Sequence, residues 1–137
     1  LFSLTLPGSA ELIRWTIRDT GFDMHLSGEV PGRIGAVLQE PGVRAAILNG
    51  WNAEDVPYWA VHAGGRSILD AVGRGLVLPQ GALAASRDVL HRFGNMSSST
   101  LMFVLQELIA KPEPGNGIAI AFGPGLAAEG FRFRRVP

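Results

Sequence analysis

The stretch Trp59–Gly65, with the sequence WAVHAGG, predicts a buried strand that ends in an imidazole. Such a strand carries His62 to the carboxyl edge of a sheet, where open α/β folds bind ligands. Gly64 and Gly65 leave room for a substrate, and the helix expected after them offers free backbone N–H groups at its start. Against this, a lone histidine after a strand is commonly a core residue whose ring hydrogen-bonds a backbone carbonyl. For the segment alone, the core interpretation of His62 is favoured.

A second segment, Gly94–Ser98 (GNMSS), places an amide side chain at the start of a predicted helix. Asn and Ser are ordinary helix caps, so capping alone can account for Asn95. Four hydroxyl residues in succession, Ser97–Thr100, exceed what one cap needs. They indicate polar atoms that face either a cavity or solvent.

The rest of the chain alternates between strand and helix patterns. Short alternating or continuous apolar runs predict strands, and apolar residues three or four apart predict helices. We expect strands at 12–18, 22–26, 58–61, 118–122 and 126–133 and helices at 30–38, 66–76, 79–93 and 97–109, with 43–48 either strand or helix and 49–57 and 111–117 as loops. Ala121–Gly125 (AFGPG) joins the last two strands, as a hairpin turn or as a stiff loop that shapes a pocket wall. This order predicts an α/β fold with helices packed on a mixed sheet.

Composition narrows the function classes. The 137 residues suit one domain with a substantial core. Lys plus Arg and Asp plus Glu number 12 each, which argues against electrostatic capture of nucleic acid or of an anionic membrane. We expect the basic tail, Arg132, Arg134 and Arg135, to lie on an edge strand with its charges in water. The chain has no cysteine, which excludes thiol catalysis and thiolate metal sites within it.

The sequence contains no apolar run long enough to span a membrane and no signal-peptide pattern, so we expect a cytoplasmic protein. Its first residue is Leu1 rather than Met, and 47% of its residues are apolar. We therefore expect a fragment of a longer protein, with an apolar face that needs a partner.

Together, the three segments resemble the C-terminal half of chalcone and stilbene synthases, the type III polyketide synthases. In that family a His-Pro-Gly-Gly segment carries the catalytic histidine, a Gly-Asn-Met-Ser-Ser segment carries the catalytic asparagine, and a Gly-Phe-Gly-Pro-Gly loop shapes the cavity. The stretches 68–72 (ILDAV) and 84–90 (AASRDVL) are similar to the family as well. Ala63 and Ala121 depart from the pattern, in place of the usual proline and of the first loop glycine.

The resemblance implies a thiolase-like α/β fold in which residues 1–137 form the C-terminal half, with a mixed sheet of the five-stranded type. The nucleophilic cysteine would lie on the absent N-terminal half, so the isolated chain should be inactive. The implied catalytic residues are His62 and Asn95. They would donate hydrogen bonds to the thioester of malonyl-coenzyme A and stabilise the enolate that forms as carbon dioxide leaves. His62 would also hold the cysteine as a thiolate.

The resemblance also implies substrate contacts and partners. The implied substrate-binding residues are Met24, Gly64, Gly65, Ser67, Ser97, Phe122, Gly123 and Pro124. Met24 would occupy the gate at the mouth of the acyl cavity, as a flexible side chain. The implied partners are malonyl-coenzyme A, an acyl-coenzyme A starter, the N-terminal half and a second subunit, with no nucleic acid, membrane, metal or other cofactor.

Three other functions compete with this interpretation. A free-standing, catalytically inactive half would serve dimerisation or regulation. A serine hydrolase would use Ser86 or Ser97 with His62, but the Gly-x-Ser-x-Gly elbow is absent and no Asp is obviously placed to orient the imidazole. A metal site built from His25, His62 and His91 lacks a recognisable ligand spacing.

Overall fold

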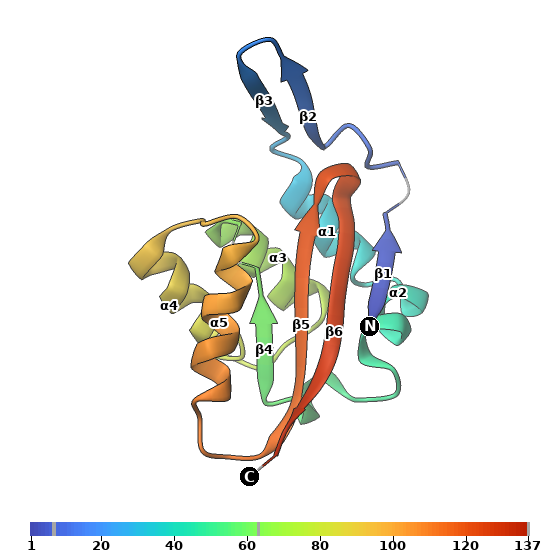
Figure 1. The fold of residues 1–137 in the computed structure, drawn as a ribbon. Helices are drawn as coiled ribbons and strands as arrows, with labels where there is room; N and C mark the ends of the chain where they lie inside the picture. Colours follow the sequence, from blue (N-terminus) through green and yellow to red (C-terminus); the bar gives the residue numbers. More distant parts are fainter. Residues whose placement is uncertain (7, 63, 137) are drawn as a thin grey trace.

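One mixed sheet forms the centre of the molecule. The structure, a computed structural model, describes residues 1–6, 8–62 and 64–136. Within those ranges the main sheet has four strands, in the order β1 (Phe2–Thr5), β6 (Ala127–Arg135), β5 (Gly115–Gly123) and β4 (Tyr58–Val61) (Figure 1). β4 is parallel to β5, whereas β6 is antiparallel to both of its neighbours. The predicted α/β class with a mixed sheet is confirmed.

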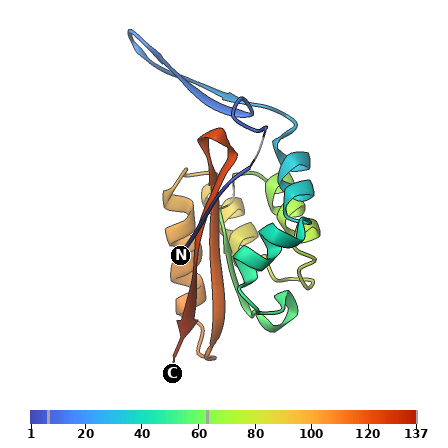
Figure 2. The same ribbon diagram turned by 90° about the vertical axis from the view of Figure 1, so that its right-hand side faces the viewer.

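Helices cover both faces of this sheet (Figure 2). One face carries α1 (Val30–Val37), α2 (Pro41–Leu48) and α3 (Arg66–Gly75), and the other carries α5 (Ser99–Ile109). Helix α4 (Ala84–Phe93) packs against β4, α3 and α5, beside the open edge of β4 (Figure 1). Two short 3₁₀ helices, η1 (Ala53–Asp55) and η2 (Pro124–Leu126), lie in connections. None of the helices in the described ranges is long and apolar enough to cross a membrane.

Strand β4 is buried on both faces, which explains its unbroken apolar sequence. Trp59 and Val61 belong to the core beneath α1, α2 and α3, whereas Tyr58 and Ala60 belong to the core beneath α5. Each of the four is at most 4% exposed. A strand in this position needs apolar side chains at every residue because both faces pack against helices.

Two helices differ from the expectation. The ambiguous stretch 43–48 is part of α2, and Pro41 and Gly42 begin this helix rather than ending the one before it. Helix α4 begins at Ala84, not at Pro79. Gly81 has a φ of +82°, outside the range of a right-handed helix, so the residues between 79 and 83 form turns instead.

Strand β1 has no counterpart among the predicted elements, and it changes the position of β6. Its four residues are too few to show a period, and they are held by pairing with Ala127–Gly130 at the other end of the chain. This pairing ends at Gly130, so in the described ranges residues 131–135 pair with β5 alone, and the edge strand expected for the basic tail is confirmed. The expectation that its charges lie in water is wrong for Arg132, whose guanidinium donates to the carbonyl oxygens of Ala46 and Ile47, at 2.8 and 3.0 Å. These oxygens belong to the last turn of α2, where backbone acceptors lack helical partners.

The predicted strands at 12–18 and 22–26 form a separate hairpin, β2 (Ile13–Arg18) and β3 (Gly21–Leu26), so the main sheet has four strands in the described ranges rather than five. Both views show this hairpin projecting from the body (Figures 1 and 2). Its register pairs Ile13 with Leu26, Trp15 with Met24, and Ile17 with Phe22. Because side chains alternate along a strand, these six apolar residues share one face of the hairpin. The remaining predicted elements are confirmed with small shifts at their ends.

Candidate active site

His62 lies directly after β4, at the carboxyl edge of the sheet. Its backbone N–H donates to the carbonyl oxygen of Ile120 at 2.9 Å, which extends the parallel pairing of β4 and β5 by one residue. The imidazole is half-buried, and this burial lowers the pKa of His62 because desolvation disfavours the charged ring. Its Nδ1 atom is buried and makes no hydrogen bond within the described parts of the chain. The side chain is thus held neutral near pH 7.

Gly64 and Gly65 lead from His62 into α3 through a tight turn. The N–H of Gly64 donates back to the carbonyl oxygen of His62 at 3.0 Å, and the carbonyl oxygen of Gly65 accepts from the N–H groups of Ile68 and Leu69. A Cβ atom on Gly64 would lie 3.6 Å from Nε2 of His62. The space beside Nε2 is therefore the space that a side chain at position 64 would fill. Ala63, the departure from the family pattern, lies outside the described residues.

Asn95 joins the two segments. Its Nδ2 donates to the carbonyl oxygen of Gly64 at 3.2 Å, and its Oδ1 accepts from the N–H of Ser97 at 2.8 Å. Gly64 therefore has the amide of Asn95 at its carbonyl oxygen and the imidazole of His62 beside its Cα, although 33 positions of the sequence separate His62 from Asn95. An amide nitrogen has two N–H groups, so Asn95 can hold Gly64 and still offer a donor to a ligand.

Helix capping explains only part of the Gly94–Ser98 segment. The cap position of α5 is Ser98, whose side chain makes no capping hydrogen bond. Ser97 has a φ of +57°, an uncommon conformation for a residue other than glycine. Thr100 is fully buried, and its hydroxyl accepts from the N–H of Met96 at 2.9 Å. The turn thus directs Asn95 towards Gly64, while Ser97 stays exposed.

The other predicted site residues lie at the same end of the molecule. The carboxyl ends of β4 and β5 and the amino ends of α3 and α5 all point towards the hairpin (Figure 1). Ser67 is exposed in the first turn of α3, and Phe122 and Gly123 end β5 as half-buried residues. Pro124 is exposed and begins η2, which packs against β2. Met24 projects on the exposed apolar face of the hairpin.

Solvent reaches both site residues, because His62 is half-buried and Asn95 is exposed. Two hollows of about 430 and 520 Å³ lie elsewhere, and neither includes His62 or Asn95. The larger hollow is apolar and lies between β1, β6 and the start of α5. In the described residues no group of three or more His, Asp or Glu side chains could hold a metal ion. His25 lies on the hairpin and His91 on α4, both exposed.

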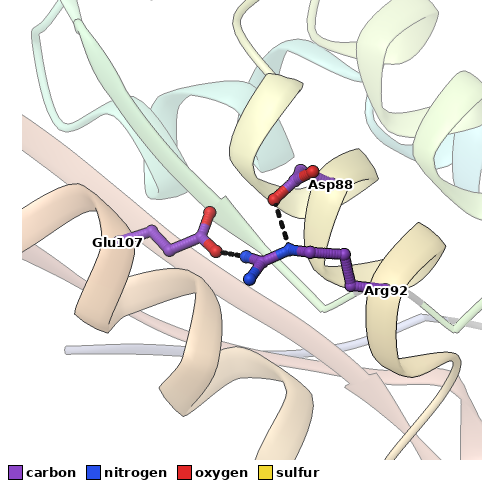
Figure 3. Close-up of polar contacts among 3 residues, drawn as sticks. All are labelled: Asp88, Arg92 and Glu107. Atoms are coloured by element: carbon purple, nitrogen blue, oxygen red, sulfur yellow. Dashed lines mark hydrogen bonds and ion pairs between the residues drawn. The ribbon is translucent and has the colours of Figure 1, made fainter.

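Ion pairs of Arg92 lie on the two helices that flank the segment carrying Asn95. Arg92, in the last turn of α4, pairs with Asp88 at 2.7 Å and with Glu107 of α5 (Figure 3). These groups are partly exposed, so each pair contributes little to stability. The pair with Glu107 connects α4 to α5, the two helices that flank Gly94–Ser98, and so helps to fix their relative position.

From its sequence context Ser86 is a candidate only as a nucleophile, and its environment in the structure contradicts that role. Its side chain is fully buried, and Oγ accepts a hydrogen bond from the N–H of Val61 at 3.1 Å. One sequence signal was present: Ser86 stands three residues before the buried Val89, on the inward stripe of its helix. A polar residue on such a stripe indicates a buried hydrogen bond.

Comparisons with known proteins agree with this architecture. Residues 3–137 match the family model described as "Chalcone and stilbene synthases, C-terminal domain". The chain is 35% identical over 136 residues to the "Alpha-pyrone synthesis polyketide synthase-like Pks18" of Mycobacterium tuberculosis, with the same values for Mycobacterium bovis. The alignment covers 96% of this chain and 35% of the relative, so the chain spans about a third of the length of these curated relatives.

Solved structures give the same result. PKS-I from the brown alga Ectocarpus siliculosus superimposes with a TM-score of 0.85 and 30% identity, covering 98% of this chain and 38% of that one. For 1,3,6,8-tetrahydroxynaphthalene synthase from Streptomyces coelicolor, a bacterial type III polyketide synthase, the TM-score is 0.87 with 28% identity, covering 99% and 40%. The chain therefore belongs to the chalcone and stilbene synthase family, the type III polyketide synthases, and has the thiolase-like fold of their C-terminal domain.

Proposed function

We propose that this chain supplies the histidine and asparagine of a type III polyketide synthase that condenses malonyl-coenzyme A units onto an acyl-coenzyme A starter. The observation that carries the proposal is that His62 and Asn95 both lie next to Gly64, at the carboxyl edge of the sheet. Membership of the family supports the same reaction. The relatives do not favour the alternative of a non-catalytic module for dimerisation or regulation, because they are named as polyketide synthases.

The decarboxylation of malonyl-coenzyme A is favoured by two hydrogen-bond donors beside its thioester oxygen. When the bond between the malonyl carboxylate and its α-carbon breaks, carbon dioxide leaves and the electron pair stays on the α-carbon. That pair delocalises onto the thioester oxygen as an enolate, which Nε2–H of His62 and Nδ2–H of Asn95 stabilise. The α-carbon then attacks the acyl group held on a cysteine of the N-terminal half, and the cysteine leaves as a thiolate.

The lowered pKa of His62 suits this role. A neutral imidazole has one N–H donor, and unlike an imidazolium it hydrogen-bonds the enolate oxygen without giving up its proton. In the complete enzyme, before the acyl group is loaded, the neutral ring would accept the proton of the cysteine thiol, and the imidazolium formed would stabilise the thiolate. Gly64 and Gly65 leave space for the thioester, and exposed Ser67 and Ser97 would line its approach.

The remaining predicted contacts concern the growing chain. Phe122, Gly123 and Pro124 would form one wall of the acyl cavity, and Met24 would stand at its mouth. Coenzyme A thioesters enter as substrates, and the reaction needs no resident cofactor. The N-terminal half and a second subunit would complete the assembly.

The test uses this chain fused behind the cysteine-bearing N-terminal part of the Mycobacterium tuberculosis relative, with malonyl-coenzyme A labelled at its carboxyl group. We expect His62→Ala and Asn95→Ala each to lower the release of labelled carbon dioxide by about 100-fold, the usual cost of one oxyanion donor. His25→Ala, on the exposed hairpin, is the matched control and should keep full activity.

Two results would count against the proposal. Decarboxylation that survives both His62→Ala and Asn95→Ala would show that other groups stabilise the enolate. Product formation by the isolated 137-residue chain would show that the nucleophile is not a cysteine outside it.

A further inference from the structure

Ser86 occupies a position that the reaction scheme leaves unexplained. Its side chain is fully buried in the first turn of α4, and Oγ accepts the N–H of Val61 at 3.1 Å. In the described ranges β4 pairs only with β5, so the N–H of Val61 points away from the sheet. A buried backbone N–H without an acceptor is costly, and the hydroxyl of Ser86 removes that cost.

The hydrogen bond lies one residue before His62. The N–H of Val61 is held by α4 on one side, and the N–H of His62 is held by Ile120 of β5 on the other. Two consecutive backbone groups are thus fixed from opposite directions. Rotation of the peptide between them would turn the imidazole away from its present direction.

Helix α4 also leads to the second donor. It ends at Phe93, where the N–H of Gly94 still bonds to Leu90, and Asn95 follows at once. Asn95 then contacts Gly64. The same helix therefore touches the strand before His62 with its first turn and ends beside Asn95 with its last.

We propose that Ser86 is a positioning residue for the pair of donors formed by His62 and Asn95, acting through the Val61 N–H and the placement of α4. This inference rests on the proposed function, since it assigns Ser86 to the same site. A serine suits the position because its short side chain lets the helix backbone approach the strand edge. Its hydroxyl is engaged with the backbone and fully buried, so it is not a nucleophile.

The test compares Ser86→Ala, which removes the acceptor, with Ser86→Thr, which keeps the hydroxyl. Arg87→Ala is the matched control, because Arg87 is the next residue of α4 and its side chain forms an exposed ion pair with Asp70, at 2.6 Å. On the 137-residue chain, NMR should show at least tenfold faster hydrogen exchange of the Val61 amide in Ser86→Ala. The pH titration midpoint of the His62 ring should also move in that variant, whereas Ser86→Thr and Arg87→Ala should match the unchanged chain.

Kinetics in the fused enzyme give the second readout. Displacement of a reacting group by about 1 Å can cost up to 100-fold in rate, so we expect Ser86→Ala to lower kcat for condensation by about 10-fold to 100-fold. KM for malonyl-coenzyme A should change less than twofold, because Ser86 does not touch the substrate. Ser86→Thr should restore kcat.

The outcomes separate the two proposals. Unchanged Val61 exchange and an unchanged His62 titration in Ser86→Ala would overturn the positioning role, whatever the enzyme does. A changed exchange and titration in the chain, together with an unmutated fused enzyme that releases no carbon dioxide, would leave the geometry standing and overturn the proposed function. If Ser86→Ala does not fold, Ser86→Cys, a weaker acceptor of similar size, should show intermediate exchange and rate; values equal to those of the unchanged chain would contradict the inference.

Discussion

The half-buried imidazole of His62 is the group on which the chemistry depends. Burial lowers its pKa, and its buried Nδ1 has no partner within the described ranges. Protonation would therefore place a charge where nothing in those ranges compensates it. The neutral ring is the form that the fold accommodates, and it is also the form that donates to an enolate oxygen.

This lowered pKa makes stability depend on pH. In the unfolded chain His62 takes up a proton below its ordinary pKa of about 6.5. The folded chain resists that proton until a lower pH, so the unfolded state binds more protons in between. The free energy of unfolding should therefore fall as the pH drops through about 6.5, and level off below the folded pKa.

Urea unfolding between about pH 7.5 and 5, above the carboxylate range, measures this dependence. His62→Gln should flatten the loss of stability towards acid. His25→Gln removes an imidazole on the exposed hairpin and should leave the loss as it is. An equally steep loss in His62→Gln would contradict the assignment to His62.

At the scale of elements, the long ladder of β5 and β6 depends on glycines at close contacts. Nine residues of β5 pair with nine of β6. A Cβ atom on Gly130 would overlap the carbonyl oxygen of Ala119 and the ring of Phe2. The ring of Phe133 covers Gly117 in the same way. The two contacts lie on opposite faces of the sheet, and on each face an aromatic ring fills the space that a side chain at the glycine would take.

Gly130→Ala and Gly123→Ala form a matched pair in this ladder. We expect Gly130→Ala to lower the free energy of unfolding by about 1–3 kcal/mol, the usual cost of overpacking, because backbone must move to make room. Gly123 has open space at the Cβ position and an extended φ of −131°, so its substitution should change stability by less than about 0.5 kcal/mol. Urea denaturation of both variants measures the loss in the free energy of unfolding. Equal losses would show that the atoms around Gly130 move aside freely.

At the scale of the whole molecule, the body and the hairpin differ in how they are stabilised. The body has apolar clusters on both faces of the sheet. The hairpin exposes most of its apolar face: Trp15, Phe22, Met24 and Leu26 are at least half exposed, and Ile17 is 79% exposed. In the described part of the chain, its base, including Ile13, packs against the body. An exposed face of this size is the apolar surface expected from the composition.

Ile17→Lys and Ile13→Lys test this contrast on one face of one strand. Ile17→Lys should leave the free energy of unfolding within about 0.5 kcal/mol of the original and reduce self-association of the chain, measured by light scattering. Ile13→Lys should cost at least about 1 kcal/mol because it removes a packed side chain at the hairpin base. A large loss of stability in Ile17→Lys would show that the hairpin tip packs in solution.

The sequence by itself determined the elements with a strong period, such as the apolar run of β4 and the stripe of α5, and the motifs that hold His62 and Asn95. These features are local, since a few neighbouring residues determine each strand, turn or helix. The tertiary structure alone decided what depends on contacts between distant residues. It brought the amide of Asn95 to the carbonyl oxygen of Gly64, 31 positions away, and the hydroxyl of Ser86 to the N–H of Val61, 25 positions away. It also paired β1 with β6 and brought the guanidinium of Arg132 to the last carbonyl oxygens of α2. No local spacing marks such pairs, because each partner satisfies a backbone group that comes within its reach only once the chain is folded.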